Sequence, residues 1–226
     1  MDFELMYESF FKLIKGIPLT LEVVIISTLF GFFLAILIAL MRISKRSYLS
    51  NTAYYFVYTV RGTPLLLQIF FIYYGLAQFN FIQESFLWVV LKDPFWCAII
   101  ALTLNTTAYS SEIIRGGIQS VSKGYIEAAS AVGMGKFLSF RIIMLPLAIR
   151  QALPAYGNEL ILMVKASSLI STVTLLEITG IARKIISQTF APIEIFLVAG
   201  SIYLLINFII TRGIKMAEKK LSPDLA

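Results

Sequence analysis

The sequence predicts an all-α integral membrane protein with five transmembrane helices. Of its 226 residues, 58% are hydrophobic and 14% are charged, whereas soluble domains carry about 25% charged residues. A helix needs about 20 mostly apolar residues to cross the hydrocarbon core of a bilayer. Five stretches satisfy this: residues 17–41, 53–78, 95–117, 147–170 and 191–211. Continuous apolar runs of this length argue against the alternating strands of a membrane β-barrel.

Basic residues set the direction of these spans. Twelve lysines and arginines follow the first, third and fifth spans, and five lie in the segments on the opposite side. Because cytoplasmic loops carry the excess of Lys and Arg, we expect the N-terminus outside and the C-terminus in the cytoplasm. The chain is then a single transmembrane domain over residues 1–226, with its core at 17–220.

Two connecting segments are expected to lie at the outer surface. Residues 79–93 are apolar but too short to cross the membrane, and Trp88 is suited to the interface. Residues 173–190 place apolar and small side chains on one helical face, which predicts a short helix. This helix either lines the mouth of a solute pathway or is an ordinary surface helix.

The first span carries small residues at intervals of four, namely Ser27, Gly31, Ala35 and Ala39. Such a stripe lets another helix approach closely. The neighbouring helix belongs either to this chain or to a partner, and the sequence leaves both open.

Polar side chains inside the spans are the candidates for a solute pathway. An ionisable residue at the bilayer centre costs about 3 kcal/mol on insertion scales, so Glu159 and Lys165 should face a cavity or each other. The polar lining and the structural ion pair remain alternatives. The full candidate set is Gln68, Asn105, Glu112, Asn158, Glu159 and Lys165.

The composition excludes several other chemistries. The chain has no histidine and one cysteine, Cys97, so it lacks the commonest metal ligand and proton shuttle and is expected to hold no metal. The formal net charge of +6 is modest for a nucleic-acid-binding protein, and no nucleic acid is expected as a partner. No nucleophile–base pair for an intramembrane enzyme is evident either.

The cytoplasmic connection at about residues 118–146 is the most informative segment. Tyr125–Val132 is predicted to be a short helix stopped by Gly133, and Lys136–Met144 a second one ending at Pro146. A small-residue surface with one carboxylate suits docking into a groove on a cytosolic protein. The residues with characteristic spacing are Glu127, Ala128, Ala129, Gly133, Ile143, Leu145 and Pro146.

These residues resemble the EAA loop of permease subunits of bacterial ATP-binding-cassette (ABC) importers. The resemblance covers roughly residues 17–220. Within this family, the chain is similar to the polar amino acid branch, which comprises permeases of histidine, glutamine, arginine and opine type. Many relatives carry Asp where this chain has Ala166, which affects the charge of the pathway. The matching segments are Arg61–Leu66, Ala101–Asn105, Glu112–Ile118, Leu153–Glu159 and Lys165–Leu169.

The resemblance implies the type I importer permease fold in a bacterial inner membrane. It also implies a second permease subunit, identical or related, a cytosolic ATPase dimer that uses ATP and Mg²⁺, and an extracytoplasmic amino acid-binding protein. Closure of the ATPase on the EAA loop would then alternate access for polar or basic amino acids such as arginine, lysine, ornithine or histidine. Glu159 and Glu112 would complement a cationic side chain and Lys165 a carboxylate.

The chain itself is expected to bind no cofactor and to hydrolyse no ATP. Gly135-Lys136 is followed by Phe137, so the hydroxyl that a phosphate-binding P-loop needs for Mg²⁺ is missing. A secondary transporter is the main alternative, against which stand the odd number of spans and the lack of a visible inverted repeat. A non-transporting membrane anchor is a third possibility.

Overall fold

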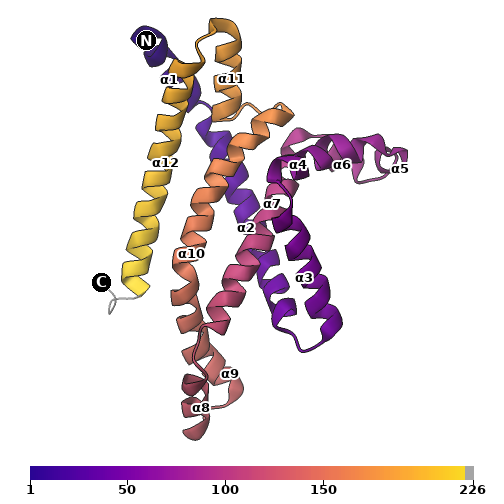
Figure 1. Ribbon diagram of the computed structural model, residues 1–226, viewed down its shortest axis with the longest axis vertical. Helices are drawn as coiled ribbons and strands as arrows, with labels where there is room; N and C mark the ends of the chain where they lie inside the picture. Colours follow the sequence, from indigo (N-terminus) through magenta and orange to yellow (C-terminus); the bar gives the residue numbers. More distant parts are fainter. Residues whose placement is uncertain (222–226) are drawn as a thin grey trace.

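The computed structural model describes residues 1–221, and every regular element in this part of the chain is helical. The predicted all-α class is therefore confirmed. The last residues of the predicted 1–226 domain, 222–226, lie outside the described part. Four long helices run along the molecule (Figure 1): α2 (Ile17–Ile43), α7 (Pro94–Gln119), α10 (Leu145–Ala166) and α12 (Pro192–Leu221).

Each long helix covers one of the predicted spans, and neighbours along the row α2, α7, α10, α12 pack against one another. By length and hydropathy, three helical stretches qualify as spans, at 17–43, 136–173 and 192–220. A bent pair of helices at 47–62 and 65–78 would make a fourth. The 26 residues of α7 are long enough to cross, but its Thr, Ser and Asn side chains lower its hydropathy. The count of five spans therefore stays a prediction.

The second predicted span, 53–78, is broken into several helical pieces. Helix α3 (Ser47–Gly62) begins earlier and is followed, after a bend of 103°, by α4 (Leu65–Phe70), a π-turn (Phe71–Gly75) and a 3₁₀ turn (Leu76–Gln78). Pro64 has no N–H and disfavours the helical conformation in the residue before it. Thr63 accordingly adopts extended angles, φ −113° and ψ 142°, and the helix breaks there.

The small-residue stripe of α2 packs against α7 of the same chain, which answers the question that the sequence left open. Ser27, Gly31, Ala35 and Ala39 are all buried. A Cβ atom on Gly31 would collide with Cγ2 of Thr106 in α7. The Thr107 hydroxyl lies 3.4 Å from the Gly31 carbonyl oxygen, so the two backbones approach closely at this point.

Two shorter helices, α1 and α11, lie at the end of the molecule that is uppermost in Figure 1. Helix α1 (Phe3–Ile14), which we did not predict, starts at Asp2, whose carboxylate accepts a hydrogen bond from the Leu5 amide. The predicted short helix in 173–190 is present as α11 (Ile178–Thr189), after a 3₁₀ stretch (Ser167–Val173). Both α1 and α11 contact α12.

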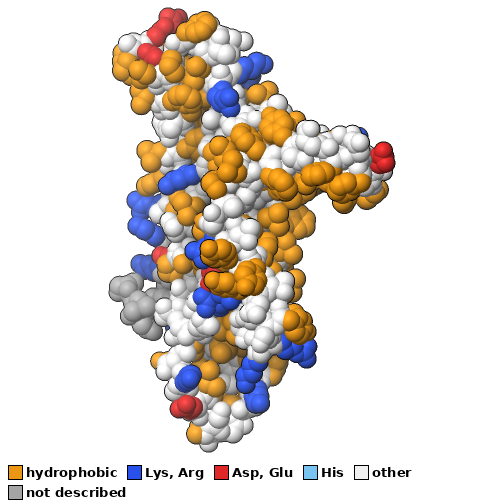
Figure 2. All heavy atoms as spheres, turned by 45° about the vertical axis from the view of Figure 1, so that its right-hand side comes forward, with side chains coloured by type: hydrophobic (Ala, Val, Ile, Leu, Met, Phe, Trp, Pro, Cys, Tyr) orange, Lys and Arg blue, Asp and Glu red, His pale blue; other side chains and the backbone are white. Residues whose placement is uncertain are grey.

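Residues 79–93 form a lateral arm rather than a span, as predicted. It holds only the short helices α5 (Asn80–Gln83) and α6 (Trp88–Leu91) and extends sideways from α4 (Figure 1). Figure 2 shows hydrophobic side chains along one side of this arm.

The inner hairpin, which we define as residues 118–146, lies at the opposite end of the molecule from α1 and α11 (Figure 1). It contains α8 (Lys123–Ala131), α9 (Lys136–Ser139) and a π-turn (Phe140–Met144). The prediction that its second helix ends at Pro146 is wrong, because the helical path continues through the π-turn into α10. Pro146 occupies the first turn of α10, where the missing proline N–H costs little.

The described end of α12 also lies towards the inner hairpin (Figure 1). This arrangement agrees with the predicted direction of the spans. The side of the membrane on which the hairpin lies stays a prediction.

Candidate functional site

The inner hairpin exposes five of the seven residues that matched the EAA spacing, together with apolar neighbours. Glu127 and Ala128 are exposed on α8, whereas Ala129 is buried within the hairpin. Val132 and Phe137 are each 76% exposed. Large apolar side chains that remain in solvent at a polar tip mark a protein-binding surface.

The turn of the hairpin depends on Gly133. Its φ of +79° lies in the left-handed region, which L side chains rarely adopt and which commonly ends a helix. The amide of Gly133 donates to the Ser130 carbonyl, and that of Met134 donates to the Ala129 carbonyl, at 3.0 Å each. Ile143 is partly buried, whereas Leu145 and Pro146 are exposed where α10 begins.

The bend between α3 and α4 is held by Gln68. Its side-chain nitrogen lies 2.7 Å from the Val60 carbonyl oxygen, 3.1 Å from that of Thr63 and 2.9 Å from the Thr63 hydroxyl. In a continuous helix the Val60 carbonyl would accept from the N–H of residue 64, which proline lacks. This position of Gln68 favours a role in the bend over the predicted role in the pathway.

A cavity of about 470 Å³ opens beside this bend. We call it the bend cavity. Three parts of the chain line it: the bend itself, α7 and α10. Its lining residues are Arg61, Gly62, Thr63, Pro64, Leu65, Asn105, Tyr109, Glu159, Leu162, Met163 and Ala166.

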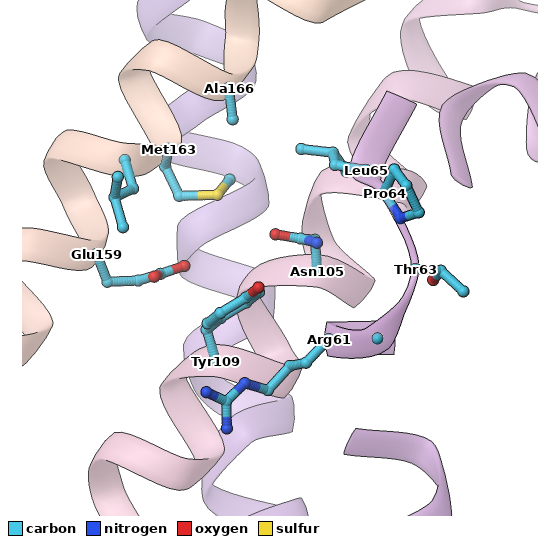
Figure 3. A pocket seen from close by; sticks show the side chains of 11 residues that line it. Arg61, Thr63, Pro64, Leu65, Asn105, Tyr109, Glu159, Met163 and Ala166 are labelled. Atoms are coloured by element: carbon cyan, nitrogen blue, oxygen red, sulfur yellow. The ribbon is translucent and has the colours of Figure 1, made fainter. Parts of the chain in front are cut away.

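Opposite charges and an amide face this cavity (Figure 3). Glu159 of α10 and Asn105 of α7 point toward one another across it. Glu159 is only 5% exposed. The guanidinium carbon of Arg61 lies 4.9 Å from the centre of the Tyr109 ring, a cation–π contact that orients the charge. The cavity thus offers a carboxylate and a guanidinium to the two ends of a zwitterion.

The structure brings together only two of the six predicted pathway residues, Asn105 and Glu159. Asn158 is exposed on a different face of α10. Lys165 lines a second cavity near the outer end of that helix. The ion pair between Glu159 and Lys165, one of the two alternatives that the sequence left open, is not formed in the described residues.

Glu112 lies in a cluster of ion pairs that joins α2 to α7. One of its oxygens is 3.1 Å from Nε of Arg42, and the other is 2.6 Å from Nη2 of Arg115. Arg42 also lies over the Tyr54 ring of α3, 5.0 Å from its centre. Two cations already neutralise this carboxylate, which argues against the predicted contact with a solute.

Sequence reasoning did not place Arg61 and Tyr109 among the pathway candidates. Arg61 precedes the Pro64 break by three residues, and this proximity is the signal that could have found it. Within residues 1–221, no group of three or more His, Cys, Asp or Glu side chains is arranged to hold a metal ion.

Comparison with known proteins decides the family. The model of the family described as "Binding-protein-dependent transport system inner membrane component" matches residues 27–223. The chain belongs to this family. It is similar to the nopaline transport system permease protein NocM of Agrobacterium fabrum, with 55% identity over all of this chain and 94% of that protein.

Two further curated proteins resemble this inner membrane component over most of their length. The octopine transport system permease protein OccM of Rhizobium meliloti is 52% identical over 97% of this chain and 89% of its own. The histidine/lysine/arginine/ornithine transport system permease protein HisM of Escherichia coli is 39% identical over 91% of this chain and 87% of its own.

Solved structures confirm the fold of the inner membrane component. A chain of an amino acid ABC transporter, crystallised with histidines, matches with a TM-score of 0.86 and 32% identity over 97% of this chain and 99% of that one. A chain of the inward-facing MetNI methionine ABC transporter matches with a TM-score of 0.78 at 17% identity, over 98% and 99%. The chain therefore has the type I importer permease fold.

The protein is thus a permease subunit of an ABC amino acid importer, in a bacterial inner membrane, and the secondary-transporter alternative is set aside. Members of its family work with an ATPase in a separate subunit and with a substrate-binding protein.

Proposed function

We propose that this permease chain carries basic amino acids or opines, and that the solute passes through the bend cavity. The single observation that carries the proposal is the buried Glu159 facing Asn105 across that cavity, with Arg61 at its edge. The names of the relatives, which mention nopaline, octopine and arginine, support solutes that bear both a cation and a carboxylate.

The chemistry of the cavity suits such a solute. Glu159 would bind a guanidinium or ammonium group, and Arg61 would bind a carboxylate in the two-pronged geometry that guanidinium allows. The amide of Asn105 can donate to one group and accept from the other. Ala166, which stands where many relatives carry Asp, leaves Glu159 as the single carboxylate in the lining.

The predicted partners complete the proposed cycle. A second permease subunit, identical or related, would close the pathway from the side that this chain leaves open. A cytosolic ATPase dimer, using ATP and Mg²⁺, would bind the inner hairpin through Glu127, Ala128 and the exposed apolar residues around them. The binding protein would deliver the solute from outside.

Uptake by the reconstituted importer, with its ATPase and binding protein, tests the role of Glu159. We expect Glu159→Gln to reduce uptake of radiolabelled L-arginine, nopaline or octopine about 10- to 100-fold, because a hydrogen bond to a charged group contributes about 1.5–3 kcal/mol. The matched control is Glu84→Gln in the exposed arm, which should leave uptake unchanged. Unaltered uptake by Glu159→Gln, with the ATPase still attached, would remove the bend cavity from the pathway.

A further inference from the structure

A second cavity, about 340 Å³ in volume, lies between the last turn of α10, the start of α11 and the first half of α12. We call it the outer cavity. It shares no lining residue with the bend cavity, and its size lies in the range of small-molecule sites. Its lining residues are Lys165, Ser168, Thr179, Phe196, Ala199, Gly200 and Tyr203.

A buried carboxylate behind this cavity fixes the direction of its hydrogen bonds. Glu177 is fully buried and caps α11, accepting from the amides of Thr179 and Gly180 at 2.9 Å each. The Tyr203 hydroxyl lies 2.6 Å from the same carboxylate. In this bond the Tyr203 hydroxyl is the donor and the Glu177 carboxyl oxygen is the acceptor.

This bond determines what the neighbouring hydroxyl groups offer to the cavity. The Thr179 and Tyr203 oxygens are 3.1 Å apart. Because the Tyr203 proton is already used, Thr179 must donate to Tyr203. The Ser168 hydroxyl donates to the Lys165 carbonyl at 2.7 Å. The hydroxyl protons of Ser168, Thr179 and Tyr203 are therefore all used in these bonds. Toward a ligand in the cavity, their oxygen atoms act as hydrogen-bond acceptors.

Lys165 supplies the opposite charge. It is exposed, and no salt bridge among residues 1–221 involves it. It is the outermost of three exposed polar residues spaced by seven on α10, with Gln151 and Asn158, so the three share one face of the helix. Such a polar face is costly against lipid, which favours contact of this face, and of the outer cavity at its end, with water.

We propose that the outer cavity binds the α-carboxylate and α-ammonium groups of the transported amino acid before the solute reaches the bend cavity. Lys165 pairs with the carboxylate, and the oxygens of Thr179 and Tyr203 accept from the ammonium group. This proposal rests on the proposed function, because it assigns a first station on the same pathway. Gly200 leaves room for the ligand, since nothing lies within 4 Å of a Cβ atom built on it.

Protection of a reporter cysteine tests the outer cavity without measuring transport. Ser168→Cys in the assembled importer should react with a charged, membrane-impermeant thiol reagent. L-arginine should slow this reaction at least about fivefold, and nopaline or octopine should do so if they are the solutes. Agmatine, which is arginine without its carboxylate, should give no protection. Ser167→Cys is the control, because Ser167 is fully buried, and the native Cys97 is also fully buried.

Four second-site variants, at two positions, make the outcome specific. Adding Lys165→Gln to Ser168→Cys should abolish protection while the cysteine remains reactive, whereas Lys165→Arg should retain protection. Gly200→Ala should be tolerated, and Gly200→Leu should fill the cavity and remove protection. Equal protection by agmatine and L-arginine would overturn the proposal, as would no protection by any of the three solutes. A reaction rate that changes only with the anionic lipid content would assign Lys165 to a lipid headgroup and overturn it too.

The same assay separates this proposal from the proposed function. Glu159→Gln should lose uptake but keep the protection of Ser168→Cys by L-arginine. If L-arginine protects Ser168→Cys but Glu159→Gln does not change uptake, the bend cavity is not on the solute pathway and the outer cavity remains a binding site. If Glu159→Gln loses uptake but L-arginine does not protect Ser168→Cys, only the bend cavity remains as a binding site.

Discussion

At the scale of single residues, close backbone approach between α2 and α7 depends on Gly31. The side chain that a Cβ atom on Gly31 would meet is Thr106, which is β-branched and fully buried. Its χ1 angle is restricted in a helix, so it has little freedom to move aside. Small residues at such positions are what allow helices to pack where no hydrophobic effect drives them together.

We therefore expect Gly31→Ala to destabilise the protein by about 1–3 kcal/mol, the usual cost of overpacking. Thermal unfolding in detergent measures this. The double variant Gly31→Ala/Thr106→Ser lacks the colliding methyl group and should regain most of the loss. Gly200→Ala has open space around its new Cβ atom and serves as the control. An equal loss in the single and double variants would show that the collision is not the cause.

The different roles of Glu112 and Glu159 become clear only from their neighbours in the structure. Glu112 and Glu159 look alike in the sequence, each an acidic residue in a long apolar stretch. In the structure, Glu112 is paired with two arginines, whereas no salt bridge within residues 1–221 involves Glu159, which lines the bend cavity. The partners come from helices that are distant in the sequence, so no local pattern separates the two cases.

At the scale of elements, the bend at Thr63 and Pro64 positions Arg61 and creates one wall of the bend cavity. The break follows from the missing proline N–H, and Gln68 stabilises it by donating to the carbonyl groups of Val60 and Thr63. A proline at position 64 disfavours a continuous helix whatever its neighbours are. The angle of the bend, 103°, depends on how α4 packs against α7.

Replacing Pro64 tests this account of the bend. Pro64→Ala restores an N–H, and Pro64→Ala/Gln68→Leu also removes the side-chain donor, so we expect the double variant to straighten the segment. Spin labels on the exposed Tyr55 and Phe81 should then move apart, as measured by pulsed electron paramagnetic resonance. Gln188→Leu, at an exposed amide on α11, is the control. An unchanged distance would mean that tertiary contacts alone hold the angle.

The inner hairpin offers a matched pair of glycines. Gly133 has a φ of +79° and Gly135 a φ of −64°, and nothing lies within 4 Å of a Cβ atom on either. Gly133→Ala should cost about 1–2 kcal/mol through backbone strain alone, whereas Gly135→Ala should be neutral. Co-purification of the ATPase subunit measures the effect, and we expect it to fall for Gly133→Ala only. Equal retention by both variants would show that the shape of this turn is not needed for docking.

At the scale of the whole molecule, the chain has two chemically different ends. One end carries the inner hairpin and the described end of α12, and the other carries α1 and α11 (Figure 1). Both cavities lie between these ends, next to the helices that run the length of the molecule. A solute path along α10 would therefore connect the outer cavity with the bend cavity.

The orientation of these ends can be measured with single cysteines. We expect Gln188→Cys, exposed near the end of α11, to react with an impermeant maleimide on intact cells. Val132→Cys, at the tip of the inner hairpin, should react only after the membrane is permeabilised. The buried Cys97 gives the background. The reversed pattern would contradict the predicted direction of the spans and the proposed contact of the hairpin with a cytosolic ATPase.

The resemblance to ABC importer permeases implied a separate ATPase. The residues themselves predict the membrane location, the helical class and the hairpin with its turn at Gly133. These properties depend on composition, on local backbone preference and on spacing along one segment, all of which are readable in order along the chain. The packing of the helices settles three further points: which neighbour the Gly31 stripe meets, that Glu112 is neutralised, and that Arg61, Asn105 and Glu159 share a cavity. Those facts depend on contacts between helices that are 40 to 100 residues apart, and the free energy of such contacts is set by geometry that no single helix contains.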